Sequence, residues 1–246
     1  MEARPYVPGD EARHVDWRAS ARTGDLYSKR FEPEHARVCL VVMDPDIRQF
    51  FGTRVRFKSV QAARVGAAAA WWALHQGDRI GSLDTTDGSV TGPRQGKGGV
   101  MAVLQALQHT YAHPPQDTVP PLANGLPLVA RLARGGTVVV VAEPHRLAAV
   151  PLSWWARLGM RQSVHLVCVA DPLEVAPPAC RLVVATPSGR QVIDLADPLV
   201  RQAWLAERGQ ALAGLEQAGL PGVHLHVVMT DQPAATWLPL PLPGAG

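Results

Sequence analysis

The chain has 246 residues, of which 47% are hydrophobic and 18% are charged, and its formal net charge is +3. This length and composition indicate one large domain with extensions and exclude a largely disordered chain. Residues 1–4 lead into a polar segment unlike a signal peptide, and the longest apolar helical run, residues 66–74, is too short to cross a bilayer. We therefore expect no membrane span in this chain.

Cysteine usage indicates a reducing compartment. The chain has three cysteines, an odd number. Two of them, Cys39 and Cys168, lie inside apolar runs where a small buried side chain fits, and the third is Cys180. We expect a cytoplasmic protein that associates with a membrane only through partners.

Residues 2–37 form a polar segment with seven basic and seven acidic residues. This balance excludes a nucleic-acid-binding arm, which needs a surplus of positive charge. Residues 26–31 predict a short edge strand. We interpret residues 1–37 as an N-terminal arm that packs on the following domain through Leu26, Tyr27 and Phe31, beside a hairpin described below.

Short apolar runs alternate with helical patterns over residues 38–230. The apolar runs predict strands at 38–43, 79–83, 137–142, 163–170 and 223–229. The helical patterns cover 57–75, 100–111, 122–134, 152–158 and 197–218. This alternation predicts an α/β domain with a doubly wound, mostly parallel sheet flanked by helices, in which the strand order reverses near residues 38–43.

Turn residues predict two hairpins. Residues 84–88 lead into a short strand at about residue 90, and residues 181–185 and 191–195 form a small hairpin inserted at about 180–195. From residue 231 the chain is rich in proline and alanine, so we expect a loosely ordered tail over 231–246.

Two of the predicted strands end in a carboxylate, Asp44 in one and Glu143 in the other. Fully apolar runs are typical of central strands, so we expect these two strands to be neighbours. Ligands of open α/β sheets lie beyond the carboxyl ends of the strands. The candidate functional site is therefore this carboxyl edge, formed by residues 44–52, 84–98, 112–121 and 143–150.

No glycine-rich turn follows the first strand of the domain, which argues against a Rossmann or Walker nucleotide site. Residues 44–48 leave an enzymatic interpretation open, because they resemble the Asp-x-Asp-x-Thr/Val motif of haloacid-dehalogenase-like phosphotransferases. Asp44 would be the nucleophile and Asp46 the acid/base. However, Arg48 replaces a small residue, and Glu143 stands alone where that family has several acidic metal ligands. A metal-dependent phosphatase is the alternative function.

A longer motif lies in the N-terminal arm. It reads Glu2-x-Arg4-x-Tyr6-x-Pro8-Gly9-Asp10-x-x-Arg13-His14-Val15-Asp16-Trp17-Arg18-x-Ser20-Ala21-Arg22. This motif resembles the signature of the domain of unknown function 58 family, and the likeness continues to about residue 231. The residues that carry it most clearly are Pro8, Gly9, Asp10, Arg13, Asp16, Trp17 and Arg22.

The resemblance implies a von Willebrand factor A-like fold and a bacterial protein of the cytoplasmic face. It also implies work with a MoxR-type AAA+ ATPase in the assembly or maturation of other proteins, without an established catalytic mechanism. Relatives in this family usually carry further residues before the position of Glu2.

Von Willebrand A domains bind Mg²⁺ through Asp-x-Ser-x-Ser after the first strand, a Thr from a later loop and an Asp after the fourth strand. The resemblance puts Asp44 at the first position, Asp46 and Arg48 at the two serines, and Glu143 at the later Asp, with no Thr clearly placed. The three carboxylates could offer oxygen ligands to Mg²⁺. The guanidinium of Arg48 could instead pair with them and replace the cation. We expect a degenerate site without a cofactor, with Mg²⁺ as the open alternative.

We therefore expect a non-enzymatic protein-interaction domain. Its interface would combine charged and apolar side chains of the carboxyl edge: Asp46, Arg48, Arg94, Lys97, Glu143, Phe50, Phe51 and Tyr111. For Asp16 and Trp17 we favour a structural role, with the indole in a core, over a role in docking. For His224 and His226, on one face of a strand, we also favour a structural role over a zinc site.

Overall fold

The computed structural model describes residues 2–5, 17–30, 37–116, 118–186 and 189–238. The chain forms two compact units, residues 1–36 and 37–246, and each is described by itself. The predicted packing of the arm on the domain therefore stays a prediction.

The first unit contains a two-stranded antiparallel sheet and a short helix. Strand β1 (Glu2–Pro5) pairs with β2 (Tyr27–Arg30), which confirms the strand predicted at 26–31. Helix α1 (Trp17–Thr23) was not predicted. The Trp17 side chain is 68% exposed among the described residues, and its expected structural role stays a prediction, as does the packing of the arm. The motif residues from Pro8 to Asp16 lie outside the described residues.

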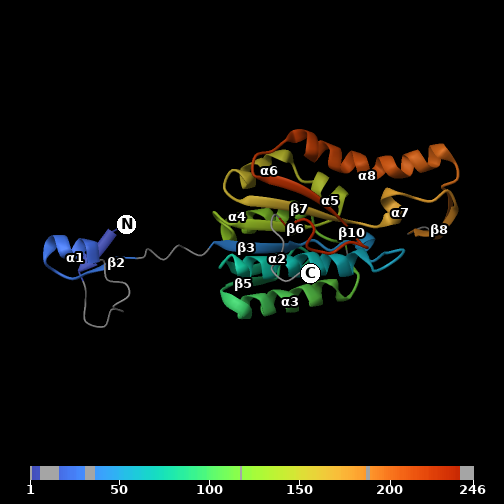
Figure 1. Ribbon diagram of the computed structural model, residues 1–246. Helices are drawn as coiled ribbons and strands as arrows, with labels where there is room; N and C mark the ends of the chain where they lie inside the picture. The colour runs from blue at the N-terminus through green and yellow to red at the C-terminus, as the bar shows by residue number, and fades with distance from the viewer. Residues whose placement is uncertain (1, 6–16, 31–36, 117, 187–188, 239–246) are drawn as a thin grey trace. The chain divides into compact units, whose positions relative to one another are not determined.

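The second unit is built on a six-stranded sheet (Figure 1). Its order is β10 (Val223–Met229), β7 (Ser163–Ala170), β6 (Thr137–Val141), β3 (Val38–Met43), β4 (Arg79–Asp84) and β5 (Val90–Arg94). All neighbours are parallel except β5, which runs antiparallel to β4. Strands β3 and β6 are paired, and the order reverses between them. The predicted fold class and the predicted neighbouring strands are confirmed.

Helices cover both faces of this sheet because successive side chains of a strand point to opposite sides. Cys39, Val41 and Met43 of β3 face α2 (Lys58–His75) and α3 (Gly96–Ala112) in one core. The residues between them, Leu40 and Val42, belong to the other core. That core contains residues of α4 (Leu126–Leu132), α5 (Pro144–Ala148), α6 (Leu152–Gly159) and α8 (Pro198–Ala218).

Glycines allow α2 to fit and to end where it does. A Cβ atom on Gly66 would lie 2.6 Å from Cδ2 of Leu107, so a larger residue there would force the Leu107 side chain to shift. Gly77 has a φ of +76°, which is strained for side-chain-bearing residues, and it follows the end of α2 as the sequence predicted.

The shorter elements lie in the connections. They are η2 (Ile47–Gln49), η3 (Leu122–Asn124), α7 (Pro172–Val175) and the hairpin of β8 (Arg181–Thr186) with β9 (Gly189–Asp194). The hairpin confirms the predicted insertion. Helices α5 and α7 were not predicted, because four or five residues are too few to show helical periodicity.

The expectation of a loosely ordered tail is wrong for residues 231–238. Ala234 and Trp237 are each 7% exposed and belong to the core that contains α2. The Trp237 ring packs 5.6 Å from the rings of His165 and His226. The buried indole of Trp237 and its contacts with the two imidazole rings hold this segment on the domain. These contacts join residues far apart in the sequence, so composition could not predict them. Residues 239–246 lie outside the described part of the chain.

Among the helices of the described residues, we find none with the length and apolar character needed to cross a bilayer.

Candidate functional site

Asp44 follows β3 and is fully buried at the carboxyl edge of the sheet. Its carboxylate accepts two hydrogen bonds from Arg146, from Nε to Oδ2 and from Nη2 to Oδ1, each 2.7 Å long. The hydroxyl of Thr85, just after β4, donates to Oδ1 at 2.5 Å. Both carboxylate oxygens of Asp44 are therefore bound inside the protein.

Arg146 lies on α5, directly after β6, and this neighbouring strand brings its guanidinium to Asp44. Nη2 of Arg146 also donates to the carbonyl of Pro120 at 2.6 Å, and Nη1 to that of Val119 at 3.4 Å. The hydrogen bonds with Asp44 raise the pKa of Arg146 against the opposing effect of burial. The sequence suggested Arg48 as the cation that pairs with Asp44. In the structure that cation is Arg146.

Asp46 has a different partner, the imidazole of His145. Oδ2 of Asp46 lies 3.2 Å from Nε2 of His145, and Oδ1 accepts the backbone N–H of Arg48 at 2.9 Å. Burial alone raises the pKa of Asp46, but the hydrogen bonds from His145 and Arg48 and their positive charges outweigh it and lower the pKa. Arg48 itself is exposed on η2, so it acts on Asp46 through its amide and its charge.

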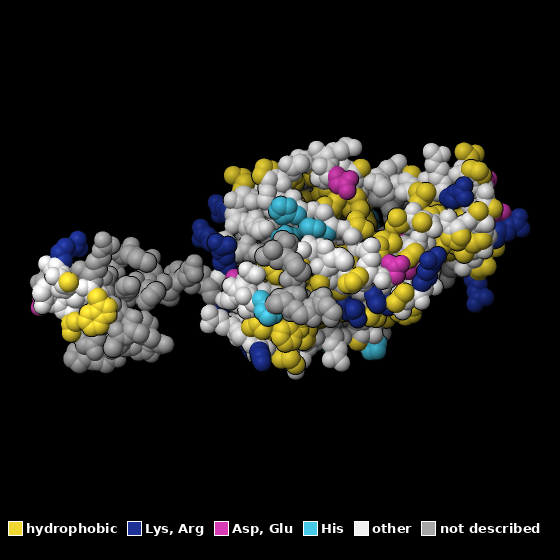
Figure 2. Space-filling view, viewed as in Figure 1, with side chains coloured by type: hydrophobic (Ala, Val, Ile, Leu, Met, Phe, Trp, Pro, Cys, Tyr) yellow, Lys and Arg dark blue, Asp and Glu magenta, His cyan; other side chains and the backbone are white. Residues whose placement is uncertain are grey.

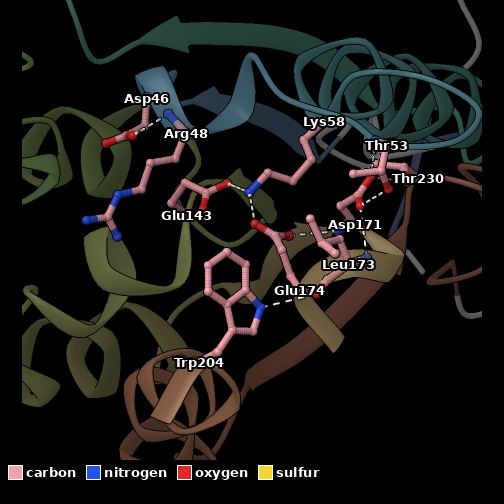
Figure 3. A network of polar contacts seen from close by, with 10 residues as sticks. All are labelled: Asp46, Arg48, Thr53, Lys58, Glu143, Asp171, Leu173, Glu174, Trp204 and Thr230. Carbon is pink, nitrogen blue, oxygen red and sulfur yellow. Dashed lines mark hydrogen bonds and ion pairs between the residues drawn. The ribbon is translucent and has the colours of Figure 1, made fainter. Parts of the chain in front are cut away.

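Glu143, the carboxylate after β6, pairs with the buried ammonium of Lys58. Nζ of Lys58 lies 2.8 Å from Oε1 of Glu143 and 2.9 Å from Oε1 of Glu174 (Figure 3). Lys58 has no exposed surface and Glu143 is 1% exposed. Glu174 also accepts the backbone N–H of Asp171 at 2.8 Å, within a capping box of α7. The network joins α2, β6 and α7 beneath the edge.

Asp171, at the end of β7, ties the loop after β3 to the far strands. It accepts hydrogen bonds from the backbone N–H of Thr53 at 2.9 Å, from the Thr53 hydroxyl and, at 3.2 Å, from the Thr230 hydroxyl (Figure 3). Burial raises the pKa of Asp171, but these donors and the amide of Leu173 together lower it. The loop that holds Thr53 is thereby fixed to β7 and to the end of β10.

The three carboxylates predicted as metal ligands do not converge on one point, because each contacts a different side chain. Asp44 binds Arg146, Asp46 binds His145, and Glu143 binds Lys58. Magnesium requires several oxygen ligands in near-octahedral geometry around one point. Within the described residues, no group of three acidic, His or Cys side chains is arranged as a metal site. These residues do not fit a shared Mg²⁺ ion.

The aromatic residues predicted at this edge differ in exposure. Phe51 is 38% exposed and Phe50 is half-buried. Tyr111 is only 7% exposed, so its expected exposure is wrong. Burial raises the pKa of the Tyr111 hydroxyl well above its usual value, and the negative charges of Asp44, Asp84 and Glu143 add to this. Tyr111 belongs to the core under the edge, since α3 turns this face toward the sheet.

A polar cavity of about 280 Å³ opens beside Pro45, between the turn after β4 and the end of α3. Asp84 in its wall accepts hydrogen bonds from the Thr86 amide at 2.8 Å and from the Thr110 hydroxyl at 2.5 Å. A second carboxylate of the lining, Asp87, accepts the amide of Ser89 at 2.8 Å, so both of these carboxylates are bound by donors of the protein itself.

Sequence reasoning missed several residues of the site, among them Thr85, Lys58 and Arg146. Thr85 follows β4 directly, and Arg146 lies three residues after Glu143, close to the end of β6. Their positions near the carboxyl ends of predicted strands were a signal that could have identified both. Lys58 begins α2 and gives no signal, because a lysine in a first helical turn is ordinarily solvated. Only the packing of α2 over the sheet buries it.

The fold and site define an α/β domain whose carboxyl edge carries internal ion pairs at the topological switch point. The family model described as "Protein of unknown function DUF58" matches residues 2–211, and the chain belongs to this family.

Similar curated proteins are uncharacterized proteins of mycobacteria. Rv1480 of Mycobacterium tuberculosis and Mb1516 of Mycobacterium bovis are each 26% identical to this chain over 183 residues. The match covers 72% of this chain and 56% of each relative, so the chain spans about half the length of the curated relatives it matches.

A solved structure, the VWA domain of SpRpn10, is similar to 81% of this chain and is itself covered to 92%, with 10% identity and a TM-score of 0.41. The fold class follows from the strand order and pairing given above, independently of this likeness.

Proposed function

We propose that this chain is a non-enzymatic domain that binds another protein through the carboxyl edge of its sheet. The observation that carries the proposal is the contrast between the edge's interior and its surface. Inside, the carboxylates are bound by Arg146 and Lys58. Outside, large apolar side chains after β3 face solvent: Ile47 is 61%, Val55 is 56% and Phe57 is 53% exposed. Clustered exposed apolar side chains are typical of interaction sites.

The ion pairs support a degenerate form of the metal-ion-dependent adhesion site. In this proposal Arg146 and Lys58 supply the positive charge that a divalent cation would supply, and Thr85 takes the role of the missing Thr. The same contacts argue against the phosphatase alternative, because both oxygens of Asp44 are occupied by donors. A nucleophilic carboxylate must be free to attack phosphorus.

The family resemblance supports a MoxR-type AAA+ ATPase as partner, in the assembly or maturation of other proteins at the cytoplasmic face. This chain spans about half the length of the curated relatives it matches. The partner is therefore proposed for the whole protein, and this domain would supply one binding surface for it. The edge combines charged and apolar groups, which suits binding of a protein such as an ATPase. Its carboxylates Asp44 and Glu143 are paired with Arg146 and Lys58 and are not placed for catalysis.

The experiment is a pull-down of a purified MoxR-type ATPase from the same source, with ATP, with ADP and without nucleotide. Phe51→Ala with Arg48→Glu changes two exposed edge residues and should weaken the complex without unfolding the domain. The matched control is Met160→Ala with Arg161→Glu, also exposed but at the opposite end of β7, where its strand begins. If the edge variant binds like the wild type, the edge is not the docking surface.

Two further readouts test the rest of the proposal. Absence of any complex in all three nucleotide conditions would refute the partner class. Hydrolysis of a generic aryl phosphate with Mg²⁺, lost in Asp44→Asn, would refute the non-enzymatic assignment.

A further inference from the structure

The segment from η2 into α2 has an unusual charge pattern. Residues 47–64 contain five basic residues and no acidic residue. One of the five, Lys58, is buried against Glu143 and Glu174, which leaves four arginines. We call the exposed part of this segment the basic apolar surface; it consists of Ile47, Arg48, Phe51, Arg54, Val55, Phe57, Val60 and Arg64.

The apolar members of this surface are large and solvent-exposed. Besides Ile47, Val55 and Phe57, Val60 on the first turns of α2 is 46% exposed. Arg64 is exposed one helical turn after Val60, so the two share the outer face of α2. In Figure 2, Lys and Arg side chains lie among hydrophobic ones on the part of the domain that carries the carboxyl ends of the strands.

The positive charge of this surface is only partly compensated. Nη1 of Arg56 donates to Oε1 of Gln61 at 3.0 Å and to the carbonyl of Thr230 at 2.6 Å, both uncharged groups. The nearest acid in sequence, Asp46, interacts with His145 and with the amide and charge of Arg48, and Asp231 is an exposed acid that follows β10. Arg54 and Arg64 are exposed on this surface, which therefore attracts negative charge.

The backbone under this surface is held in place. The Phe51 carbonyl accepts the amide of Lys58 at 2.8 Å, and Gln61 donates to the carbonyls of Met229 at 2.9 Å and Gln232 at 2.8 Å. A Cβ on Gly52 would lie 2.2 Å from the Arg56 carbonyl oxygen, so the loop closes tightly on itself. Together with the Thr53 contacts to Asp171, these bonds preorganise the surface, which lowers the entropic cost of binding a partner.

We propose that the basic apolar surface binds an acidic amphipathic segment of the partner protein, whose apolar side chains contact Val55, Phe57 and Val60 and whose carboxylates pair with Arg54 and Arg64. This inference rests on the proposed function. Guanidinium groups pair with carboxylates through two parallel hydrogen bonds, and apolar anchors with a charged rim are typical of protein interfaces. The surface exposes three β-branched aliphatic side chains, Ile47, Val55 and Val60, beside the two phenylalanines. This aliphatic majority favours a protein over single-stranded nucleic acid, which stacks on aromatic rings. The absence of lysines on this surface differs from the Lys/Arg clusters that bind anionic lipids.

The test uses two synthetic helical peptides with the same leucines at positions i, i+3, i+4 and i+7, one with glutamates and the other with lysines at the remaining positions. Binding to the full chain is measured by fluorescence anisotropy at low and high salt. The glutamate peptide should bind, more weakly at high salt, and the lysine peptide should not. Arg54→Glu with Arg64→Glu should weaken binding of the glutamate peptide about tenfold or more, because like charges then face each other.

Matched controls separate charge and apolar contributions from general damage. Arg131→Glu with Arg161→Glu reverses two exposed arginines near α4 and α6, on the other face of the sheet, and should leave binding unchanged. Val55→Ser with Val60→Ser should weaken binding, whereas Leu152→Ser with Met160→Ser on and after α6 should not. Circular dichroism and unfolding curves confirm that each variant is folded.

Equal binding of both peptides, or equal loss in test and control variants, would overturn the inference. Preferential binding of an oligothymidylate or of phosphatidylglycerol vesicles, abolished by the same two arginine changes, would also overturn it and assign the surface to nucleic acid or lipid. If the ATPase is captured but the glutamate peptide does not compete with it, this inference fails while the proposed function stands. If no protein partner binds at this edge, the proposed function fails.

Discussion

Arg146 holds the buried carboxylate of Asp44 with two hydrogen bonds of 2.7 Å, from Nε and from Nη2. Asp44 has no exposed surface, and the side chain of Arg146 is 13% exposed. Such a two-bonded pair is geometrically specific, and removal of one partner leaves the other charge buried. The pair thus converts the strand end at the switch point into a fixed, neutral structure.

Arg146→Ala should destabilise the domain by about 3–5 kcal/mol, because Asp44 would remain buried without its cation. Urea unfolding followed by circular dichroism measures the change. Asp44→Asn combined with Arg146→Gln should recover part of the loss, because both charges are then removed together. If the double variant is as unstable as the sum of the single variants, the two residues do not act as a pair.

Arg48→Ser should destabilise the domain by less than Arg146→Ala, by about 1 kcal/mol or less, because the Arg48 side chain is exposed and its backbone amide, which serine keeps, still donates to Asp46. A role for Arg48 as the cation that neutralises the carboxylates of the edge would instead predict a large loss. Unfolding curves of Arg48→Ser and Arg146→Ala under the same conditions rank the two arginines, and a larger loss for Arg48→Ser would contradict the pairing in the structure.

Lys58→Met should destabilise the domain by about 3–5 kcal/mol at neutral pH, because two buried carboxylates, Glu143 and Glu174, would lose their shared cation. Urea unfolding curves of Lys58→Met and the wild type at pH 7 measure the change. A loss as small as that expected at an exposed lysine would contradict the role of the buried ion pairs.

Addition of Mg²⁺ or Mn²⁺ to the wild type should produce no binding heat in titration calorimetry and no rise in melting temperature. The reason is that Asp44, Asp46 and Glu143 contact three different side chains, which are Arg146, His145 and Lys58. A ligand that binds the native state at one hundred times its Kd stabilises it by about 2.7 kcal/mol, which a thermal melt detects easily. Tight metal binding would contradict the proposed replacement of the cation.

Acid should weaken the domain through His165. Burial and the neighbouring His226 and His224 lower the pKa of His165 to about 4 from 6.5. Its Nδ1 lies 3.1 Å from Nε2 of His226, and Trp237 packs against both rings. Between these two pKa values the unfolded state binds a proton that the folded state does not. Stability is therefore complete above about pH 6.5 and falls toward pH 4, by up to about 3 kcal/mol.

His165→Gln should flatten this fall, because glutamine does not titrate. Unfolding curves at pH 7, 6, 5 and 4.5 measure it, with His75→Gln, an exposed position at the end of α2, as the control. Parallel pH profiles for wild type and His165→Gln would show that the histidine cluster does not link stability to pH.

The sequence by itself determined the layered architecture. Fully apolar runs such as residues 38–43 and 137–142 cannot be solvated on either face, so they had to become central strands with helices on both sides. The carboxylates after them, Asp44 and Glu143, were placed correctly at one edge, because parallel neighbouring strands end together. Periodicity over long segments also predicted α2 and α8, where many residues repeat the same pattern.

The tertiary structure alone decided how that edge is neutralised. Arg48 is the cation nearest to Asp44 in the sequence, yet Asp44 binds Arg146, which is 102 residues away. Glu143 binds Lys58, which is 85 residues away. The sequence likewise predicted that Trp237 belongs to a loosely ordered tail, whereas in the structure its ring packs on His165 of β7 and His226 of β10. A local pattern reports whether a residue is buried or exposed. Which charge meets which in the interior depends on helix packing across the sheet, and the low dielectric there makes that choice decisive for stability.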